Sequence, residues 1–484
     1  MNSTNTSTGV AGIVLAAGGS RRFGQAKQLL EWGGRPLVTH IADTAWMAGL
    51  DPVIVVVGAA ADRVIPLLEN RPVQVARNYR WDQGMSSSLQ AGIAALPPGI
   101  EAALFIPIDQ PLISVPLLQG FVRQWRTTRA GIIVPKAPEG QRGTPVLFAS
   151  EFFPELTALT GDVGGRALFG QHAQRVTYLP ISDASILADV DTPETYTALL
   201  ESTQAAGPAI DWDSLRGLIC DMDGVLWRGD SPLPGLEAFF AVLEALQISY
   251  MLVTNNSSRT PDQYVEKLRK MGVETTTKHV LNSAMAAARH IAETKPDATV
   301  FAIGGPGVRQ AVEAEGLAYR DDIGIKHADF VLVGWDQQLT WTKLAAATRL
   351  ILDGATFVST NPDRTFPLEA TLAPGNGAQT AALTAATGVT PIVAGKPAAL
   401  LYQQAMARMG TPPESTLVIG DRLDTDILGG IRLGNPTALV LTGVSTADEL
   451  HGSPIRPTIV FNDLPSLTEA WYRSAIKKED PHNG

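Results

Sequence analysis

Two carboxylates, Asp221 and Asp223, follow the apolar run Gly217–Cys220 and stand directly before a glycine. At the end of a buried strand, this spacing can place a nucleophile and an acid/base on one substrate. The same pattern is also common in surface turns, so the pair needs partners to indicate chemistry. Three later apolar runs end in complementary polar residues: Thr254, Lys396 and Asp421, with Asp424 and Asp426 beyond. Because parallel strands bring their carboxyl ends to one edge of a sheet, the sequence predicts a single site from these residues.

These segments resemble the haloacid dehalogenase superfamily, and in particular its NagD-like branch with a C2 cap. The resemblance covers most of residues 214–446. It is carried by four stretches in family order: Asp221-Met222-Asp223-Gly224, Thr254-Asn255-Asn256-Ser257, Gly395-Lys396-Pro397 and Gly420-Asp421-Arg422-Leu423-Asp424-Thr425-Asp426-Ile427.

The resemblance implies a phosphatase that uses Mg²⁺. Asp221 is expected to attack phosphorus and form an aspartyl phosphate, while Asp223 protonates the leaving oxygen and then activates water. Thr254 and Lys396 are expected to hold the phosphoryl oxygens. Asn255 and Asn256 are the implied contacts of the substrate phosphate, and Asp363 and Arg364 are further candidates from the cap side or a loop. The implied metal ligands are Asp221, Asp223 through its backbone carbonyl, and Asp421, with Asp426 more distant from the metal as a partner of these ligands.

A second pattern is the glycine-rich loop from Ala16 to Lys27, which follows the apolar run Gly12–Leu15. Glycines let backbone amides approach an anion closely, and the cations Arg22 and Lys27 can neutralise phosphate charge. A tight strand-to-helix turn also needs glycine for structural reasons alone. The two cations within a dozen residues favour the phosphate interpretation.

Later carboxylates could complete a nucleotide site with a metal. Asp109 ends the apolar run Leu104–Ile108, where open α/β sheets bind ligands, and it suits Mg²⁺ holding a triphosphate. It could equally open a turn before Pro111. Of the pair Asp189 and Asp191, the second could supply another metal ligand or be only the N-cap of a helix at 193–200.

These features resemble the MobA-like NTP transferases, most closely the molybdenum cofactor cytidylyltransferase branch, over nearly all of residues 9–200. The matching segments are Leu15–Lys27, Asn78–Ser88, Asp109–Pro111, Arg142–Pro145, Gly161–Arg166 and Asp189–Glu194. The resemblance implies nucleotidyl transfer from an NTP, with CTP favoured over GTP, to a phosphorylated acceptor such as molybdopterin. Ile108 stands where many relatives have glycine, which leaves the acceptor open.

The same resemblance implies the site residues. Asp109 and Asp191 are expected to hold Mg²⁺. The expected nucleotide contacts are Leu15, Ala16, Ala17, Gly18, Arg22, Lys27, Asn78 and Ser86. Ser86 to Ser88 could also form no more than a helix N-cap. A regulatory nucleotide-binding module, or a cytidylyltransferase for a sugar or polyol phosphate, are the alternatives for this part of the chain.

The elements that must position these residues follow an α/β rhythm of short apolar runs and longer helical stretches. We expect two doubly wound Rossmann-like domains, at 9–200 and 214–475, joined by a linker at 201–213. The second domain has its core at 214–283 and 391–475 and an inserted α/β cap at about 284–390. The expected strands are 12–17, 52–57, 103–108 and 131–135 in the first domain, 217–220, 250–253, 391–393 and 416–419 in the second core, and 299–303, 330–333 and 356–359 in the cap.

The composition excludes several other functions. The 484 residues are 45% hydrophobic and carry a formal net charge of -10, without a basic run, so we expect globular domains and no nucleic-acid partner. The single cysteine, Cys220, cannot form an intrachain disulfide, which favours a reducing cytoplasm. We expect no membrane partner because no apolar stretch approaches the length of a bilayer span. Homo-oligomerisation is left open.

Overall fold

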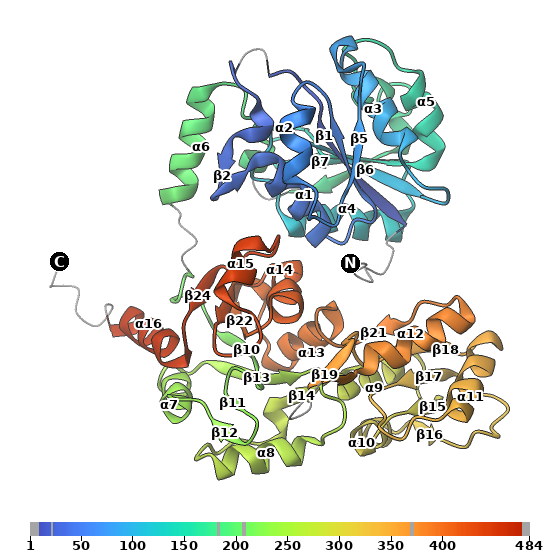
Figure 1. Ribbon diagram of the computed structural model, residues 1–484, viewed down its shortest axis with the longest axis vertical. Helices are drawn as coiled ribbons and strands as arrows, with labels where there is room; N and C mark the ends of the chain where they lie inside the picture. The colour runs from blue at the N-terminus through green and yellow to red at the C-terminus, as the bar shows by residue number, and fades with distance from the viewer. Residues whose placement is uncertain (1–8, 21–22, 182–183, 206–209, 368–371, 477–484) are drawn as a thin grey trace. The chain divides into compact units, whose positions relative to one another are not determined.

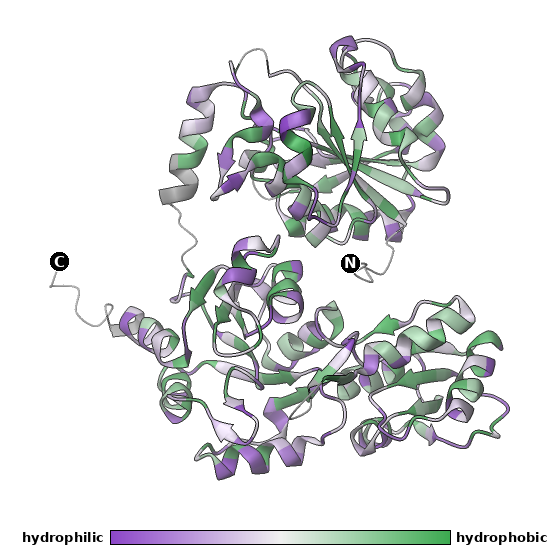
Figure 2. Ribbon diagram, viewed as in Figure 1, coloured by the Kyte–Doolittle hydropathy of each residue, from purple (hydrophilic) through white to green (hydrophobic). Residues whose placement is uncertain are grey.

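The chain divides into two compact units, Met1–Pro208 and Ala209–Gly484 (Figure 1). The structure, a computed structural model, describes residues 9–20, 23–181, 184–205, 210–367 and 372–476. Each unit is built on mainly parallel strands flanked by helices, so the predicted α/β class is confirmed. Figure 2 shows that the central strands of the large sheets are hydrophobic, as expected for sheets covered on both faces.

The first unit contains a seven-stranded sheet with the order β5-β4-β1-β6-β8-β7-β9. Strand β8 runs antiparallel to both of its neighbours, and the other pairs are parallel. The four predicted strands are present with bounds shifted by one or two residues. The strands are β1 (Val10–Ala16), β4 (Val53–Val57), β5 (Gln74–Arg77), β6 (Ala102–Pro107), β7 (Ile132–Lys136), β8 (Val146–Ala149) and β9 (Val176–Pro180).

Helices cover both faces of this sheet. Gly12 of β1 faces Ala45 of α1, whereas the next residue, Ile13, faces Gly92 of α3. Since neighbouring strand residues point to opposite faces, α1 and α3 lie on opposite sides. The helices are α1 (Leu37–Met47), α2 (Ala61–Val64), α3 (Met85–Ala94), α4 (Val115–Thr128), α5 (Phe153–Ala158) and α6 (Pro193–Ala205), and β2 (Glu31–Trp32) pairs with β3 (Arg35–Pro36) as a short hairpin.

The second unit is built on a six-stranded parallel sheet with the order β14-β13-β10-β22-β23-β24. Strands β10 and β13 end at Asp221 and Thr254, and β22 ends directly before Asp421. The predicted convergence of these strand ends at one edge is therefore confirmed. The strands are β10 (Gly217–Asp221), β13 (Ser249–Thr254), β14 (Val280–Asn282), β22 (Thr416–Gly420), β23 (Thr437–Val440) and β24 (Ile459–Phe461).

A second sheet, of five parallel strands in the order β16-β15-β17-β18-β21, forms the inserted subdomain. The prediction that 391–393 is a strand of the phosphatase core is wrong, because β21 pairs with β18 through Val358 and Ser359. An apolar run shows that a strand exists but not which sheet it joins. The strands are β15 (Thr299–Ile303), β16 (Ala318–Arg320), β17 (Phe330–Val333), β18 (Thr356–Ser359) and β21 (Ile392–Val393).

Helices and two hairpins complete the second unit. The hairpins are β11 (Trp227–Arg228) with β12 (Ser231–Pro232), and β19 (Thr365–Pro367) with β20 (Leu372–Pro374). The helices are α7 (Leu236–Ala245), α8 (Pro261–Lys270), α9 (Ser283–Thr294), α10 (Pro306–Ala314), α11 (Trp341–Leu352), α12 (Asn376–Thr387), α13 (Ala399–Met409), α14 (Leu428–Leu433), α15 (Ala447–Gly452) and α16 (Leu464–Ile476). Among the helices of the described residues, none is long and apolar enough to cross a bilayer.

The two sheets of the second unit share one hydrophobic core. A single buried cluster contains Val253 of the six-stranded sheet and Leu332 of the inserted sheet, together with Ile291 of α9 and Leu401 of α13. The inserted subdomain is thus packed against the six-stranded sheet and is not held by its connections alone.

The predicted linker at 201–213 is too long. Residues 201–205 continue helix α6, and Ile210 is buried in the core of the second unit. Trp212 packs on Trp471 with 5.3 Å between the ring centroids. Small residues and a Gly-Pro pair marked the boundary correctly, but the flanking residues have helical or buried positions that composition does not reveal.

Candidate active sites

Three carboxylates meet at the carboxyl edge of the six-stranded sheet. Asp221 ends β10, Asp421 follows β22, and Asp426 lies in the π-helical turn Leu423–Ile427 that leads into α14. All three side chains are buried, and each offers an oxygen within 4.8 Å of the others. The structure therefore brings together three of the acidic residues that the sequence predicts as metal ligands.

Lys396 lies against two of these carboxylates. Its Nζ is 2.5 Å from Asp221 Oδ1 and 2.7 Å from Asp426 Oδ1. Burial lowers the pKa of Lys396, but the adjacent carboxylates raise it more, so the pKa lies well above its ordinary value. The buried ammonium stays charged, and Lys396 lies in the segment that follows β21 of the inserted sheet.

The carboxylate cluster fits a divalent cation. Burial raises the pKa of Asp421 to about 6, and the charge of Asp426 adds to this effect. Asp421 Oδ2 accepts a hydrogen bond from the Val444 N–H at 2.7 Å, whereas its buried Oδ1 has no hydrogen-bond partner among the described residues. An orphaned carboxylate oxygen beside two more carboxylates, with one lysine to balance them, is a donor set that suits a hard ion such as Mg²⁺.

Asp223 differs from Asp221 because its side chain is exposed and lies outside the three-carboxylate group. Its Oδ1 accepts a hydrogen bond of 2.7 Å from Nε1 of Trp227, whose ring is fully buried. Lys267 Nζ lies 4.5 Å from the centroid of that ring. Trp227 therefore fixes the predicted acid/base. The sequence does not distinguish this tryptophan from one that only fills the core.

Thr254, the last residue of β13, and the following Asn255 both make hydrogen bonds inside the protein. Thr254 is buried, and its Oγ1 accepts a hydrogen bond from the Asn256 N–H at 3.1 Å. Both amide hydrogens of Asn255 are taken, because Nδ2 donates to the Lys396 carbonyl at 3.0 Å and to Asp363 Oδ2 at 3.1 Å. Contrary to the prediction, the Asn255 side chain has no donor left for a substrate phosphate.

In the first unit, Lys27 also lies between two carboxylates. Its Nζ is 3.3 Å from Asp109 Oδ2 and 2.7 Å from Asp191 Oδ1. The side chains of Asp109 and Asp191 are 28% and 52% exposed, so this site is open to solvent. The alternative of Asp191 as an N-cap does not fit, because the Thr195 N–H at the start of α6 bonds to the Thr192 hydroxyl.

The loop after β1 leaves room for a ligand. A side chain added at Gly18 would meet no atom within 4 Å. Gln28, which the sequence did not single out, donates from Nε2 to the carbonyls of Ala16 and Gly18 at 2.8 Å each. The strand runs into the loop through three predicted nucleotide contacts: Leu15, Ala16 and Ala17. The predicted contact Arg22 lies outside the described residues.

A second glutamine orders the acidic side of this site. Gln110 Nε2 donates to Asp189 Oδ1 at 2.9 Å and to the Leu187 carbonyl at 3.1 Å. Burial raises the pKa of Asp189, and the charges of Asp109 and Asp191 add to that shift. Gln110 thus ties the Asp189 carboxylate to the segment that follows β6, and Lys27 connects Asp191 to Asp109 of the same segment.

Asn78 and Ser86 make bonds inside the protein. Asn78 Nδ2 donates to the hydroxyls of Ser87 and Ser88 at 2.8 and 3.1 Å, and Ser86 Oγ donates to the Gly161 carbonyl at 2.7 Å. Helix α3 starts one residue before Ser86 with a glycine as its N-cap, so the N-cap alternative for the serines is wrong. These buried side chains position the start of α3, and their contact with a base or ribose stays a prediction.

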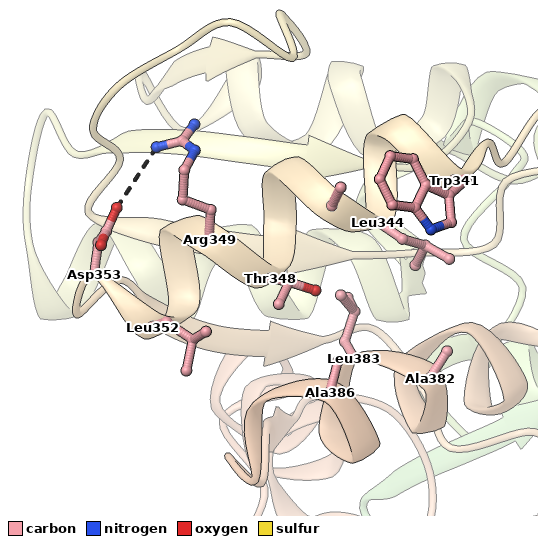
Figure 3. A pocket seen from close by; sticks show the side chains of 10 residues that line it. Trp341, Leu344, Thr348, Arg349, Leu352, Asp353, Ala382, Leu383 and Ala386 are labelled. Carbon is pink, nitrogen blue, oxygen red and sulfur yellow. Dashed lines mark ion pairs between the residues drawn. The ribbon is translucent and has the colours of Figure 1, made fainter.

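A groove on the inserted subdomain contains none of the predicted site residues. It lies between α11 and α12, with a volume of about 550 Å³ (Figure 3). Trp341 and Leu352 line it and are 79% and 61% exposed, and Arg349 pairs with Asp353 at its edge at 3.6 Å. Neither predicted reaction uses this surface.

The family models that match this chain divide it into the same two parts as the structure does. Residues 12–176 match the MobA-like NTP transferase domain, and residues 218–318 and 393–467 match two models of haloacid dehalogenase-like hydrolases. An acid sugar phosphatase of Staphylococcus aureus is 39% identical over 249 residues, which are 51% of this chain and 95% of that protein.

Two solved structures resemble the second unit. A p-nitrophenyl phosphatase from Archaeoglobus fulgidus has 34% identity and a TM-score of 0.51, and the match covers 53% of this chain and 99% of that one. A 4-nitrophenylphosphatase from Thermotoga maritima has 34% identity and a TM-score of 0.51, over 54% of this chain and 98% of that one.

Proposed function

Since the chain belongs to the haloacid dehalogenase-like hydrolases and also carries a MobA-like NTP transferase domain, we propose a bifunctional cytoplasmic enzyme that combines a cytidylyltransferase with a Mg²⁺-dependent phosphatase. The two activities use separate residues in separate units. The observation that supports the phosphatase most directly is the contact of Lys396 with both Asp221 and Asp426 in a buried carboxylate cluster.

In the first half of phosphate hydrolysis, an Asp221 oxygen attacks the substrate phosphorus. An aspartyl phosphate forms, the bond from phosphorus to the leaving oxygen breaks, and Asp223 gives its proton to that oxygen. Lys396, together with the Thr254 hydroxyl, holds the phosphoryl oxygens while charge moves onto the leaving group. Asp221 is suited to the nucleophilic role because it is buried and held by Lys396.

In the second half, Asp223 takes a proton from water, whose oxygen attacks the same phosphorus. The bond to Asp221 breaks, inorganic phosphate leaves, and both carboxyl groups return to their starting states. The exposure of Asp223 supports this role because an acid/base must exchange protons with solvent. Asp221, Asp421 and the backbone carbonyl of Asp223, with Asp426 behind them, would hold Mg²⁺, which supplies positive charge to the phosphoryl oxygens when bound.

We assign sugar phosphates to the phosphatase as its substrate class, on the basis of the acid sugar phosphatase relative. The test measures inorganic phosphate released by the full chain from a panel of hexose, pentose and polyol phosphates, with p-nitrophenyl phosphate as the reference. We expect several sugar phosphates to be hydrolysed in the presence of Mg²⁺. Hydrolysis of p-nitrophenyl phosphate with no sugar phosphate accepted would reject the substrate class and leave the phosphatase standing.

The transferase proposal is supported mainly by the position of Lys27 between Asp109 and Asp191, beside a loop with open space at Gly18. An oxygen of the acceptor phosphate attacks the α-phosphorus of the NTP, and the bond to the leaving pyrophosphate breaks. Lys27 neutralises phosphate charge as this bond breaks. Asp109 and Asp191 would hold Mg²⁺, which adds positive charge at the triphosphate when bound.

We further propose CTP as the donor and a phosphorylated small molecule as the acceptor, either molybdopterin or a sugar or polyol phosphate. A pyrimidine fits where a close-packed loop excludes a purine, and unpaired base edges add discrimination of roughly 1–3 kcal/mol. The test measures pyrophosphate release with CTP, GTP and ATP against each acceptor. Equal turnover with GTP would reject the cytidine assignment. If none of the acceptors in the panel gives pyrophosphate release, the transfer reaction itself would be rejected.

A further inference from the structure

The amide of Asn255 holds the backbone of the catalytic lysine on both sides. Asn255 Oδ1 accepts a hydrogen bond from the Lys396 N–H at 2.7 Å, and Nδ2 donates to the Lys396 carbonyl at 3.0 Å. A Cβ at Gly395 would lie 2.4 Å from Asn255 Oδ1, so only glycine permits this approach. The direction of the Lys396 peptide, and with it the start of the lysine side chain, is therefore set by one amide group.

These two hydrogen bonds form in only one of the two orientations of the Asn255 amide. If the amide turned by 180°, its oxygen would face the Lys396 carbonyl and its NH₂ would face the Lys396 N–H, so both hydrogen bonds would be lost. The backbone N–H and carbonyl of Lys396, which lies three residues after the two-residue edge strand β21, favour the bonded orientation. A third group that accepts and cannot donate would fix the orientation.

Asp363 supplies that group from the inserted subdomain. Its carboxylate accepts a hydrogen bond from the second amide hydrogen of Asn255, at 3.1 Å to Oδ2 and 3.3 Å to Oδ1. An ionised carboxylate accepts only, so it selects the NH₂ side of the amide. Burial raises the pKa of Asp363, and the positive charges of Arg422 and Lys396 oppose the shift.

The loop that carries Asp363 is itself held firmly. The Asp363 N–H donates to Asn361 Oδ1 at 3.1 Å, and its carbonyl accepts from the Gly377 N–H of α12 at 2.7 Å. Asn361 Nδ2 in turn donates to the Asn255 carbonyl at 2.7 Å. The segment that follows β18 thus contacts Asn255 at both its side chain and its backbone, which gives the inserted subdomain a direct connection to the proposed catalytic residues.

We propose that Asp363 is a positioning residue of the phosphatase, which fixes the Asn255 amide in the orientation that holds Lys396 against Asp221. The inference rests on the proposed role of Lys396 in binding the phosphoryl group. It replaces the sequence expectation that Asp363 contacts the substrate. A positioning residue affects every substrate equally, whereas a contact to the leaving group affects each substrate differently.

The experiment compares full-length variants on two substrates with unlike leaving groups, p-nitrophenyl phosphate and glucose 6-phosphate, with saturating Mg²⁺. We expect Asp363→Ala to lower kcat about tenfold by the same factor for both substrates, with KM within twofold of the wild type. Asp363→Asn, which keeps one acceptor oxygen, should lose less. Asp353→Ala, on the exposed end of α11, is the control and should match the wild type.

A double-mutant cycle separates positioning from a general structural effect. Because both side chains act through Lys396, Asp363→Ala with Asn255→Ala should be no worse than Asn255→Ala alone. Additive losses, or a loss confined to one substrate, would overturn the proposal. If Asp363→Ala does not fold by circular dichroism, the same comparisons with Asp363→Asn decide the outcome.

The lysine itself distinguishes this inference from the underlying mechanism. Lys396→Met should abolish hydrolysis of both substrates. If it remains active, the proposed phosphatase mechanism fails. If Lys396→Met is inactive while Asp363→Ala and Asp363→Asn both behave as the wild type, only the positioning role is rejected.

Discussion

The two candidate sites share one arrangement, a lysine between two carboxylates, in very different surroundings. Lys396 and its partners Asp221 and Asp426 have side chains that are 4%, 10% and 1% exposed. In the first unit, Lys27 is 11% exposed, but its partner Asp191 is 52% exposed. The phosphatase cluster therefore lies in a low-dielectric interior, whereas the transferase cluster is open to solvent on the side of its carboxylates.

The difference indicates how each site meets its substrate. In the phosphatase, Lys396 is already held between Asp221 and Asp426, so we expect the substrate phosphate to bind to groups that are in place before it arrives. In the proposed transferase site, Lys27 contacts Asp109 and Asp191, the two carboxylates that we expect to hold the metal of a bound triphosphate. The nucleotide must therefore compete with Lys27, and the lysine must turn from the carboxylates toward the phosphates.

The largest expected effect comes from Asp221→Asn, which tests whether the two sites are separate. Removing the nucleophile should lower phosphate release from p-nitrophenyl phosphate by at least about 10³-fold. Pyrophosphate release from CTP should not change, because no transferase residue lies in that cluster. Loss of both activities in a folded variant would show that the sites depend on one another.

Asp109→Asn is the converse change in the open site. Weakening the predicted metal ligand should lower pyrophosphate release about 10²-fold, since metal charge contributes several kcal/mol to such reactions. Hydrolysis of p-nitrophenyl phosphate serves as the internal control and should stay at the wild-type rate. A variant that transfers nucleotides normally would exclude Asp109 as a ligand.

The paired variants Lys396→Met and Lys27→Met test the contrast in burial directly. Loss of Lys396 leaves buried carboxylates without a cation, which should cost about 3–5 kcal/mol of unfolding free energy in the second unit. Loss of Lys27 leaves partners that water can solvate, so the first unit should change by no more than about 1 kcal/mol. Urea unfolding in EDTA, followed separately for each unit, measures both values.

The effect of added Mg²⁺ on unfolding provides a second test of the difference between Lys396→Met and Lys27→Met. If the carboxylate cluster binds the ion, added Mg²⁺ should restore part of the stability that Lys396→Met removes, because the cation replaces the missing positive charge. An equal loss for the two lysine variants, with no response to Mg²⁺, would contradict the difference in burial and the metal assignment together.

Sequence reasoning was strongest where chemistry and strand ends coincide. Asp221, Thr254 and Asp421 follow apolar runs, and parallel pairing is enough to bring them together. It was weaker for Lys396, because a short apolar run does not state which sheet it joins. Sequence reasoning did not identify Gln28 or Trp227, because their roles depend on hydrogen bonds between residues that only the folded chain brings into contact.

Asn255 illustrates the same limit in a residue that was selected correctly but given the wrong role. Its place after Thr254 predicts a residue near the phosphate, and it does lie beside the catalytic lysine. Its hydrogen bonds, however, go to Lys396 and Asp363, which are 141 and 108 residues away in the chain. The donor count of a side chain limits what it can bind, and that count is known only once its partners are.

The smallest expected effect concerns Asp223, the proposed acid/base of the phosphatase, which is exposed as Asp191 is in the first unit. Trp227→Phe keeps the buried ring but removes the N–H that holds Asp223. A hydrogen bond to a charged group contributes about 1.5–3 kcal/mol, and at an exposed carboxylate we expect the low end of that range, a fall in kcat of about tenfold with little change in KM. Trp212→Phe, a change of the same kind in the same unit, should leave kcat as it is.

The leaving group identifies the step that Trp227 supports. p-Nitrophenolate leaves without needing a proton, whereas the alkoxide of a sugar phosphate must be protonated as it departs. Trp227→Phe should therefore slow hydrolysis of glucose 6-phosphate more than that of p-nitrophenyl phosphate, whereas Asp363→Ala slows both equally. If the two substrates respond alike to Trp227→Phe, then Trp227 supports the fold around β10 and not proton transfer by Asp223.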